Sequence, residues 1–389
     1  MRKSIVIIGI ALIGLSACKK KKVTNLKEEY QVTYAELVSA GYEDSYELAK
    51  ALKTTIYDFV DNPTAVNFEA SKEAWLAARV PYGQTEAFRF AGGPIDDADG
   101  PEGLLNAWPL DEAYIDYVEG DATTGIINDP SVNIEKTILE ELNEKGGEEN
   151  ISIGYHAIEF LLWGQDDVNT ALKTKGDRPY TDYVVGANGT ASNQEKRGIY
   201  LKVCADLLVE HLTLMVNEWK EGGAYRTTYL AMDADDALNN VMTGIGVLSK
   251  SELAGERIFT ALDNQDQEDE HSCFSDNTHQ DIILNFQGIE NVCLGTYTRT
   301  NGAVVSGTSL ADVVEKSDEE LSQKLRDALA ACNASVHSIS VPFDYALTLE
   351  QPGSTGAINN SINDLRDLGD VIAEVGNHLG LSINTALPE

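Results

Sequence analysis

The sequence is poor in basic residues, cysteine, proline and methionine. Lysine and arginine together number 29, against 63 aspartates and glutamates, which gives a formal net charge of −34. This shortage of positive charge argues against a nucleic-acid partner, because binding to a phosphate backbone needs a cationic surface. The surplus of carboxylates is compatible with the capture of cations, but it also serves solubility alone.

Motifs of several enzyme classes are missing as well. The sequence has no Cys-x-x-Cys pair, no His-Glu-x-x-His motif, no glycine-rich phosphate loop with lysine and no Gly-x-Ser-x-Gly motif. These absences argue against a thiolate zinc site, a standard zinc peptidase, a P-loop nucleotide enzyme and a serine hydrolase of the α/β type. Strand patterns are scarce too, and the one candidate is a hairpin over residues 296–305 around Asn301-Gly302.

The N-terminus has the pattern of a bacterial lipoprotein signal. Arg2 and Lys3 precede an apolar run over residues 4–15, which is too short for a comfortable membrane span. The residues Leu-Ser-Ala-Cys at 15–18 then match a lipobox, where a signal peptidase cuts before a lipid-modified cysteine. The pattern predicts a signal peptide over residues 1–17, and a poorly formed anchor helix with a chance cysteine is the less favoured alternative.

Lipidation of Cys18 would hold the mature protein on a membrane surface. Residues 18–34, in which four lysines come directly after Cys18, are predicted to form a lipidated tether. The lysines could lie against anionic headgroups or simply be solvated. No acidic patch follows Cys18, so we expect a cell-envelope protein on the outer membrane that faces the periplasm.

Most of the remaining chain has apolar residues at helical spacing, with breaks at proline, glycine and asparagine. The helices that this pattern predicts cover residues 36–60, 68–80, 108–118, 131–145, 152–163, 194–221, 238–262, 279–292, 310–336 and 359–379. The polar stretch 166–193 reads as a long connection. We therefore predict an all-α fold of two bundle-like domains with a cleft between them, an N-terminal domain over 35–190 and a C-terminal domain over 191–389.

The sharpest chemical feature is a Gly-x-His-x-x-Glu motif, formed by Gly154, His156 and Glu159. The histidine and the glutamate are three positions apart, so they project from one face of the predicted helix. The helix is apolar all round, which predicts burial, and a buried imidazole and carboxylate need a partner or a metal ion. A metal site and a structural His–Glu pair that locks two helices are equally good interpretations of these residues alone.

A second ligand-rich stretch covers residues 267–281. Hard cations prefer carboxylate oxygens and borderline cations accept imidazole, so the stretch has suitable donors for a metal or a polar ligand. The candidate residues in it are Glu270, His271, Ser275, Asp276 and His279. A solvated acidic loop before a capped helix is the alternative, although Cys273 and Phe274 favour burial.

Three further residues are candidates for ligand binding. Glu86 and Arg89 precede a Gly-Gly-Pro-Ile-Asp stretch, and Asp111 follows Trp108-Pro109. The guanidinium of Arg89 could neutralise a carboxylate or bind an anion. An ordinary ion pair at a helix end is the alternative for Arg89.

Four cysteines remain after Cys18, at positions 204, 273, 293 and 332. In an oxidising compartment Cys273 and Cys293 could form a disulfide. Buried free thiols are the equal alternative, and the sequence leaves both open.

The chain resembles the imelysin-like proteins of the bacterial cell envelope. The resemblance covers nearly all of the chain after about residue 35 and is carried by residues 86–90 with 93–96, 106–110, 154–164 and 268–279. It implies an all-helical fold with the Gly-x-His-x-x-Glu residues near an interdomain cleft. It also raises the expectation that His156 and Glu159 belong to a functional site.

The resemblance implies a link to iron uptake, with an iron-transport system as partner, although the family was named for an insulin-cleaving activity. Our first hypothesis is a binder of iron or an iron-bearing ligand, with His156, Glu159, Glu270 and His271 as metal ligands and zinc as the other possible metal. A zinc peptidase is the second hypothesis. It ranks lower because hydrolysis needs about three ligands and an open water position, and the motif fixes only two ligands relative to each other. A binder of an organic ligand with a structural His–Glu pair is the third.

Overall fold

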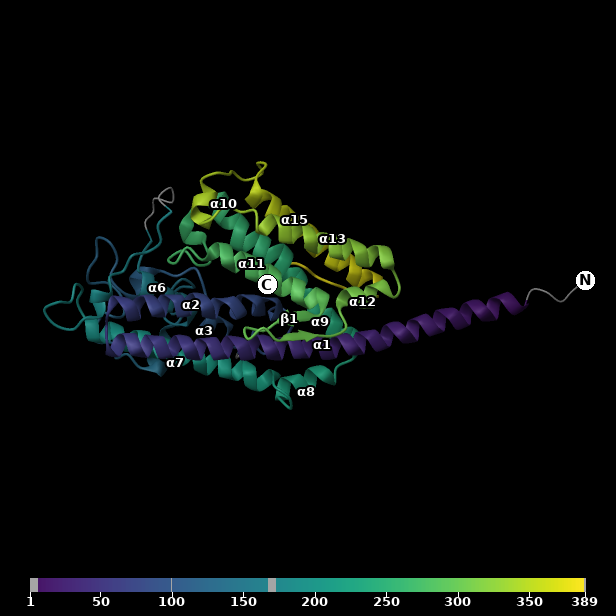
Figure 1. Cartoon of the computed structure of the whole chain (residues 1–389), viewed down its shortest axis with the longest axis horizontal. Helices are drawn as coiled ribbons and strands as arrows, with labels where there is room; N and C mark the ends of the chain where they lie inside the picture. The colour runs from purple at the N-terminus through teal and green to yellow at the C-terminus, as the bar shows by residue number, and fades with distance from the viewer. Residues whose placement is uncertain (1–5, 99, 167–172, 388–389) are drawn as a thin grey trace, which may run out of the picture.

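The computed structural model of the chain describes residues 6–98, 100–166 and 173–387, and the regular secondary structure in these ranges is almost entirely helical (Figure 1). The predicted all-α class is confirmed. The N-terminal part contains α1 Val6–Asp61, α2 Ala65–Thr85, η1 Glu86–Phe88, α3 Glu102–Leu105, α4 Glu112–Ile115, α5 Lys136–Leu142, α6 Gly154–Trp163, η3 Tyr180–Tyr183 and α7 Gln194–Trp219.

The C-terminal part adds more helices and one small hairpin. Its elements are α8 Ala224–Leu230, α9 Ala234–Val247, η4 Leu248–Phe259, α10 Thr260–Asn264, η5 Gln267–Asp269, α11 Thr278–Leu294, β1 Thr296–Thr298, β2 Val304–Ser306, α12 Leu310–Glu315, α13 Glu319–Val336, α14 Phe343–Leu347 and α15 Ala357–His378. The predicted hairpin is confirmed, because β1 and β2 pair antiparallel with Tyr297 opposite Val305.

The helices stack in layers along the long helix α1 (Figure 1). Helix α1 packs against α2 on one side and α7 on the other, α2 packs against α11, and α13 and α15 pack together over η4. One continuous cluster of buried apolar residues extends from Tyr30 in α1 to Val375 in α15. The core therefore has no break near residue 190, and the division into two domains stays a prediction.

The predicted tether over residues 18–34 was wrong in its C-terminal part. Helix α1 runs through this stretch without interruption, and Tyr30 and Tyr34 are each only 1% exposed. The hydroxyl of Tyr30 donates to the carbonyl of Val292, and Lys27 pairs with Asp235. Two large aromatic side chains at helical spacing are buried more favourably against the body than in water, so the packed part of the chain begins earlier than predicted.

The N-terminal part of α1, which includes Cys18 in its range, projects from the packed body (Figure 1). Among the described residues, none of the helices combines the length and apolarity that crossing a membrane requires. The signal peptide and the lipidation of Cys18 stay predictions.

Several helix boundaries differ from the predicted ones, and two of these differences concern helices near the site. Helix α2 continues past Pro81 to Thr85, because its buried face packs against α1 and α11 and outweighs the hydrogen bond that proline removes. The predicted helix 238–262 changes into a π-helix at Leu248–Phe259 before α10. π-Helical turns of this kind occur frequently at functional sites, and this one carries the buried Arg257.

The cysteines of the described chain after α1 are buried thiols. Cys204, Cys273, Cys293 and Cys332 are all free, so the disulfide between Cys273 and Cys293 does not form in this structure. Burial raises the pKa of the Cys273 thiol, which makes it a poor nucleophile.

Candidate functional site

The Gly-x-His-x-x-Glu motif forms the first turns of α6, whose residues are all buried. Gly154 has a φ of 89°, and a Cβ atom there would lie 2.7 Å from the carbonyl oxygen of Leu105. Glycine is required at this position both by the positive φ and by the close approach of the neighbouring backbone. This approach brings Asn106, the residue after α3, against the histidine of the motif.

His156 and Glu159 contact each other directly. The Nδ1 atom of His156 lies 2.8 Å from Oε2 of Glu159, and the two side chains are 2% and 0% exposed. Burial, helped by the positive charge of Arg79, lowers the pKa of His156 to about 3. Burial also raises the pKa of Glu159 to about 8. Both directions favour a neutral pair of imidazole and carboxylic acid.

The amide of Asn106 decides which ring nitrogen of His156 holds a proton. Arg79 can only donate, and its Nη1 lies 2.5 Å from Oδ1 of Asn106, so that oxygen is correctly oriented as an acceptor. Nε2 of His156 lies 3.2 Å from the same oxygen and must therefore be the protonated nitrogen. Nδ1 is then an acceptor, and the proton between His156 and Glu159 belongs to the carboxylic acid.

The other carboxyl oxygen of Glu159 is held by the loop before α11. Ser275 donates its backbone N–H at 3.0 Å and its hydroxyl at 2.6 Å to Oε1 of Glu159. Glu159 thus accepts two hydrogen bonds on one oxygen and donates one from the other. This arrangement satisfies a fully buried carboxylic acid without a charged partner.

A second histidine, His271, completes the centre. Its Nε2 lies 3.2 Å from Nδ2 of Asn106, which donates to it, and its ring lies 5.0 Å from the ring of His156. Its Nδ1 therefore carries the proton, yet this atom has no hydrogen-bond partner among the described residues, and Oδ2 of Asp281 is 3.8 Å away. Burial lowers the pKa of His271 well below its usual value, so this ring is neutral as well.

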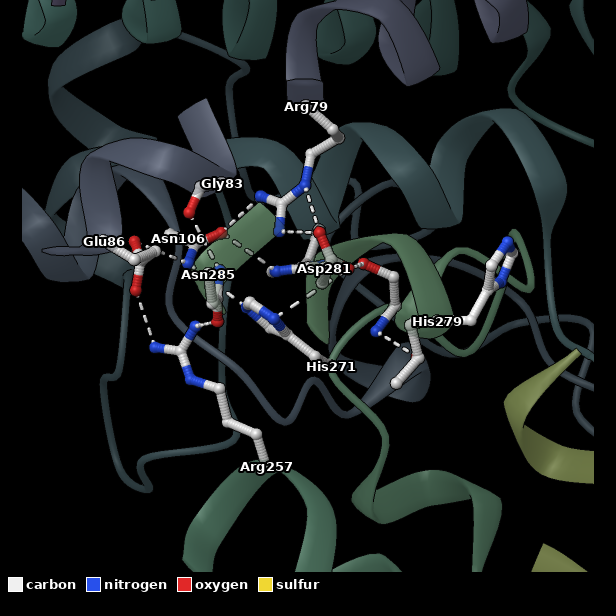
Figure 2. Close-up of polar contacts among 12 residues, drawn as sticks. Arg79, Gly83, Glu86, Asn106, Arg257, His271, His279, Asp281 and Asn285 are labelled. Atoms are coloured by element: carbon white, nitrogen blue, oxygen red, sulfur yellow. Dashed lines mark hydrogen bonds and ion pairs between the residues drawn. The ribbon is translucent and has the colours of Figure 1, made fainter. Parts of the chain in front are cut away.

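Two buried arginines, Arg79 and Arg257, approach Asn106 and His271 from opposite sides (Figure 2). Arg79 donates through Nε and Nη2 to Oδ1 of Asp281, at 3.2 and 2.8 Å. Arg257 pairs with Glu86 at 2.6 Å and donates to Asn285 at 2.8 Å. Each guanidinium therefore has a carboxylate partner, which a buried charge requires. We use the name polar centre for the two arginines and their partners together with the motif residues and their neighbours: Arg79, Asp281, Arg257, Glu86, Asn285, His156, Glu159, Asn106 and His271.

A chain of ion pairs connects the polar centre to the surface. Burial alone would raise the pKa of Glu86, but Arg257 and Arg89 outweigh it and hold that pKa below its usual value. Arg89 lies 3.5 Å from Glu86 and 2.9 Å from Glu102, and its side chain is 15% exposed. It lines a surface pocket of about 760 Å³ together with Glu102. Glu86 and Arg89 thus lie between this pocket and the motif histidine.

Several predicted site residues lie outside the polar centre, among them Asp111, His279 and Glu270. The carboxylate of Asp111 caps α4 by accepting from the N–H of Ala113, which is a structural role. The ring of His279 is turned away from the centre (Figure 2), and its Nδ1 lies 3.0 Å from the carbonyl oxygen of Asp276. Glu270 is adjacent to His271 in the sequence, but its side chain lies near a group of carboxylates and not in the polar centre. The structure therefore gathers His156, Glu159 and His271 and places Glu270 apart from them.

The carboxylates near Glu270 form a close group. In the described part of the chain, Asp166, Asp276 and Asp344 are the one group of three or more acidic, histidine or cysteine side chains whose ligand atoms all lie within 4.8 Å of one another. Burial and the neighbouring Asp344, Asp276 and Asp166 raise the pKa of Glu270 well above its usual value. We call these four residues the carboxylate cluster.

Much of the polar centre could not be recognised from the sequence. Arg79 falls within a predicted helix, where an arginine normally faces solvent, and Asp281 and Asn285 look like the polar face of α11. The site residues that the sequence did not single out are Arg79, Asn106, Asp166, Arg257, Asp281, Asn285 and Asp344. A usable signal existed for Asn106, which begins one of the segments that carry the family resemblance, and for Asp281, which ends the ligand-rich stretch 267–281.

Comparisons with known proteins agree with this fold. Iron-regulated protein A of Synechococcus elongatus is 25% identical over 351 residues, which cover 87% of this chain and 83% of that protein. The structure is similar to that of an iron-regulated protein A precursor from Parabacteroides distasonis, with a TM-score of 0.68, 20% identity and coverage of 90% of this chain and 94% of the other.

A second solved structure, an imelysin-like protein from Psychrobacter arcticum, matches with a TM-score of 0.60 and 14% identity over 93% of this chain and 98% of the other. At these identities the two structures show a shared fold. The family model described as imelysin matches residues 38–372, which is most of the sequence. The chain therefore belongs to the imelysin family.

Proposed function

We propose that this protein is a lipid-anchored protein of the cell envelope that binds iron, or an iron-bearing ligand, as part of iron uptake. The lipobox at Cys18 supports the anchor, and the printed name of the Synechococcus relative, iron-regulated protein A, supports the link to iron. The outer membrane, on its periplasmic side, is the proposed location.

The observation that carries the proposal is the buried pair of His156 and Glu159 with a second imidazole beside it. Two imidazoles and a carboxyl group are donors that suit iron and zinc. A proton held between Nδ1 of His156 and Oε2 of Glu159, 2.8 Å apart, occupies a position that a metal cation can take in exchange. The unpartnered Nδ1 of His271 is a further buried nitrogen, which can coordinate a metal once its proton has left.

Binding at this pair requires a rearrangement. Both nitrogens of His156 are engaged, one by Glu159 and the other by Asn106, and both oxygens of Glu159 are engaged as well. The surface pocket lined by Arg89 is linked to the centre by ion pairs through Arg89 and Glu86. We infer that a ligand reaches the polar centre from that side.

Because hydrogen bonds already occupy the polar atoms of His156 and Glu159, a second candidate function is the binding of an organic anion, with these two residues in a structural role. Arg89 in the surface pocket would then be the contact residue. A zinc peptidase is less well supported, because catalysis needs about three ligands and an open water position, and every polar atom of His156 and Glu159 already has a partner.

Elemental analysis of the protein purified from the cell envelope tests the proposal. Iron is expected at about one equivalent per chain in the wild type and at less than a tenth of that in His156→Ala. His337→Ala is the control, because His337 is exposed and bonds only to the backbone of Asn333. Equal iron in the His156→Ala variant and the wild type would overturn metal binding at this pair and favour the organic-ligand alternative.

A further inference from the structure

The carboxylate cluster joins three segments that are far apart in the sequence. Asp166 follows α6, Asp276 lies in the loop before α11, and Asp344 lies on α14. Their nearest carboxylate oxygens lie within 4.8 Å of one another. Negative charges at this separation repel strongly unless a cation lies between them.

Two buried carboxyl groups of the cluster have few hydrogen-bond partners for their oxygen atoms. Asp344 is 3% exposed, and beyond the backbone N–H groups of Asp344 itself and Tyr345 its carboxylate oxygens have no hydrogen-bond partner. Glu270 is also 3% exposed, and its Oε1 has none. Within the described ranges, no lysine, arginine or histidine forms an ion pair with Asp276, Asp344 or Glu270. The contrast with the polar centre is clear, because there both buried arginines have a carboxylate partner.

We propose that Asp166, Asp276 and Asp344, with Glu270 beside them, bind a hard divalent cation of the calcium class. Such cations are coordinated by carboxylate oxygens, and several carboxylates from separate loops are a usual ligand set. The cation supplies the positive charge that the buried oxygens of Asp344 and Glu270 require. The absence of imidazole and thiolate from the cluster distinguishes it from a site for zinc or a softer metal.

The cation site and the polar centre share one loop, and neighbouring residues of this loop belong to the two different sites. Glu270 belongs to the cluster, while the next residue, His271, faces Asn106 and His156. Ser275 binds Glu159, while the next residue, Asp276, belongs to the cluster. A cation bound by Asp276, with the carboxyl group of Glu270 beside it, therefore lies at both ends of the loop that positions His271 and Ser275. It also ties this loop to α14 and to the end of α6.

Calcium titration of the full-length protein, purified in detergent and stripped with EDTA, tests this site. Calorimetry is expected to show one calcium ion bound per chain, and thermal unfolding is expected to show a higher Tm with calcium. Asp344→Asn and Asp276→Asn should each lower the calcium affinity at least tenfold. Without calcium, Asp344→Asn should raise the Tm above that of the stripped wild type, because it removes a repelling charge.

Two control variants separate this site from other acidic groups and from the polar centre. Asp367→Asn changes an exposed carboxylate on α15 and should leave calcium binding unchanged. His156→Ala should also retain calcium affinity, so that this proposal and the proposed iron site fail independently. If Asp344→Asn does not fold, Asp276→Asn decides, because Asp276 is only partly buried.

Three results would overturn the proposal. One is the absence of binding of calcium, magnesium and manganese by the stripped wild type at millimolar concentration. Another is calcium binding that Asp344→Asn and Asp276→Asn leave unchanged. The third is binding of iron alone at these residues, which would assign the cluster to the transported metal.

Discussion

Ser275 holds Glu159 through two hydrogen bonds to a single oxygen, one from its backbone N–H and one from its hydroxyl. The other oxygen of Glu159 faces His156. The loop before α11 thereby determines which edge of the carboxyl group is available to the histidine. The state of the motif in α6 is thus linked to a loop more than 100 residues later in the chain.

Replacing Glu159 with glutamine is expected to change the pH dependence of stability. The pKa of Glu159 is raised to about 8 in the folded protein, so the folded state holds a proton that the unfolded state releases at lower pH. Stability from this group is complete at acidic pH and is lost as the pH rises towards 8. The lowered pKa of His156, about 3, has the opposite sign and acts only below the usual histidine pKa.

The test compares urea unfolding of the metal-stripped wild type and Glu159→Gln at pH 6.5 and 8. The wild type should lose at most about 2 kcal/mol more than the variant over this interval. Glu141→Gln, an exposed glutamate, is the control and should follow the wild type. Parallel pH profiles for the wild type and Glu159→Gln would show that Glu159 is already ionised at pH 6.5.

Gly154→Ala is expected to destabilise the protein by about 3 kcal/mol, because a positive φ and an overpacked contact both carry a cost. The added methyl would meet the carbonyl of Leu105 at 2.7 Å and push Asn106 away from His156. Gly120→Ala is a matched control, since Gly120 has a φ of 85° with nothing within 4 Å of the new methyl. Its cost should be only about 1 kcal/mol. Equal losses for both variants in chemical denaturation would contradict the close approach.

Asn106→Leu keeps the volume of the side chain but removes its hydrogen bonds. Arg79, His156 and His271 would each lose a buried partner, so a loss of about 3 kcal/mol is expected. Denaturant unfolding measures the loss, and Asn217→Leu, at an exposed position, should change stability little. A loss below about 1 kcal/mol would mean that water replaces the amide and that the centre is not sealed.

Cys18→Ser is expected to abolish lipid attachment, because only the thiol can form the thioether to the lipid. Metabolic labelling with palmitate should mark the wild type and a Cys204→Ser control but not Cys18→Ser. The intact mass of the mature wild-type protein should correspond to a chain that begins at Cys18. Palmitate incorporation into Cys18→Ser would disprove the lipobox interpretation.

Much of the fold follows from local pattern. Apolar residues at helical spacing predicted most of the long helices, and Asn301-Gly302 predicted the hairpin. The tether was mispredicted because Lys27, Tyr30 and Tyr34 can be recognised as packed only when α9 and α11 are in place against them. Pro81 was taken as a helix end because local rules omit the packing of α2 against its neighbours.

For the site, the sequence by itself determined that His156 and Glu159 share a face of a buried helix, since spacing along a helix is a local property. Only the tertiary structure decided their partners. Asn106, Arg79 and Ser275 approach from other segments, and the side-by-side residues Glu270 and His271 belong to two different clusters. The physical reason is that long-range contacts depend on how whole helices pack, and a change of loop direction between adjacent residues leaves no periodic trace in the sequence.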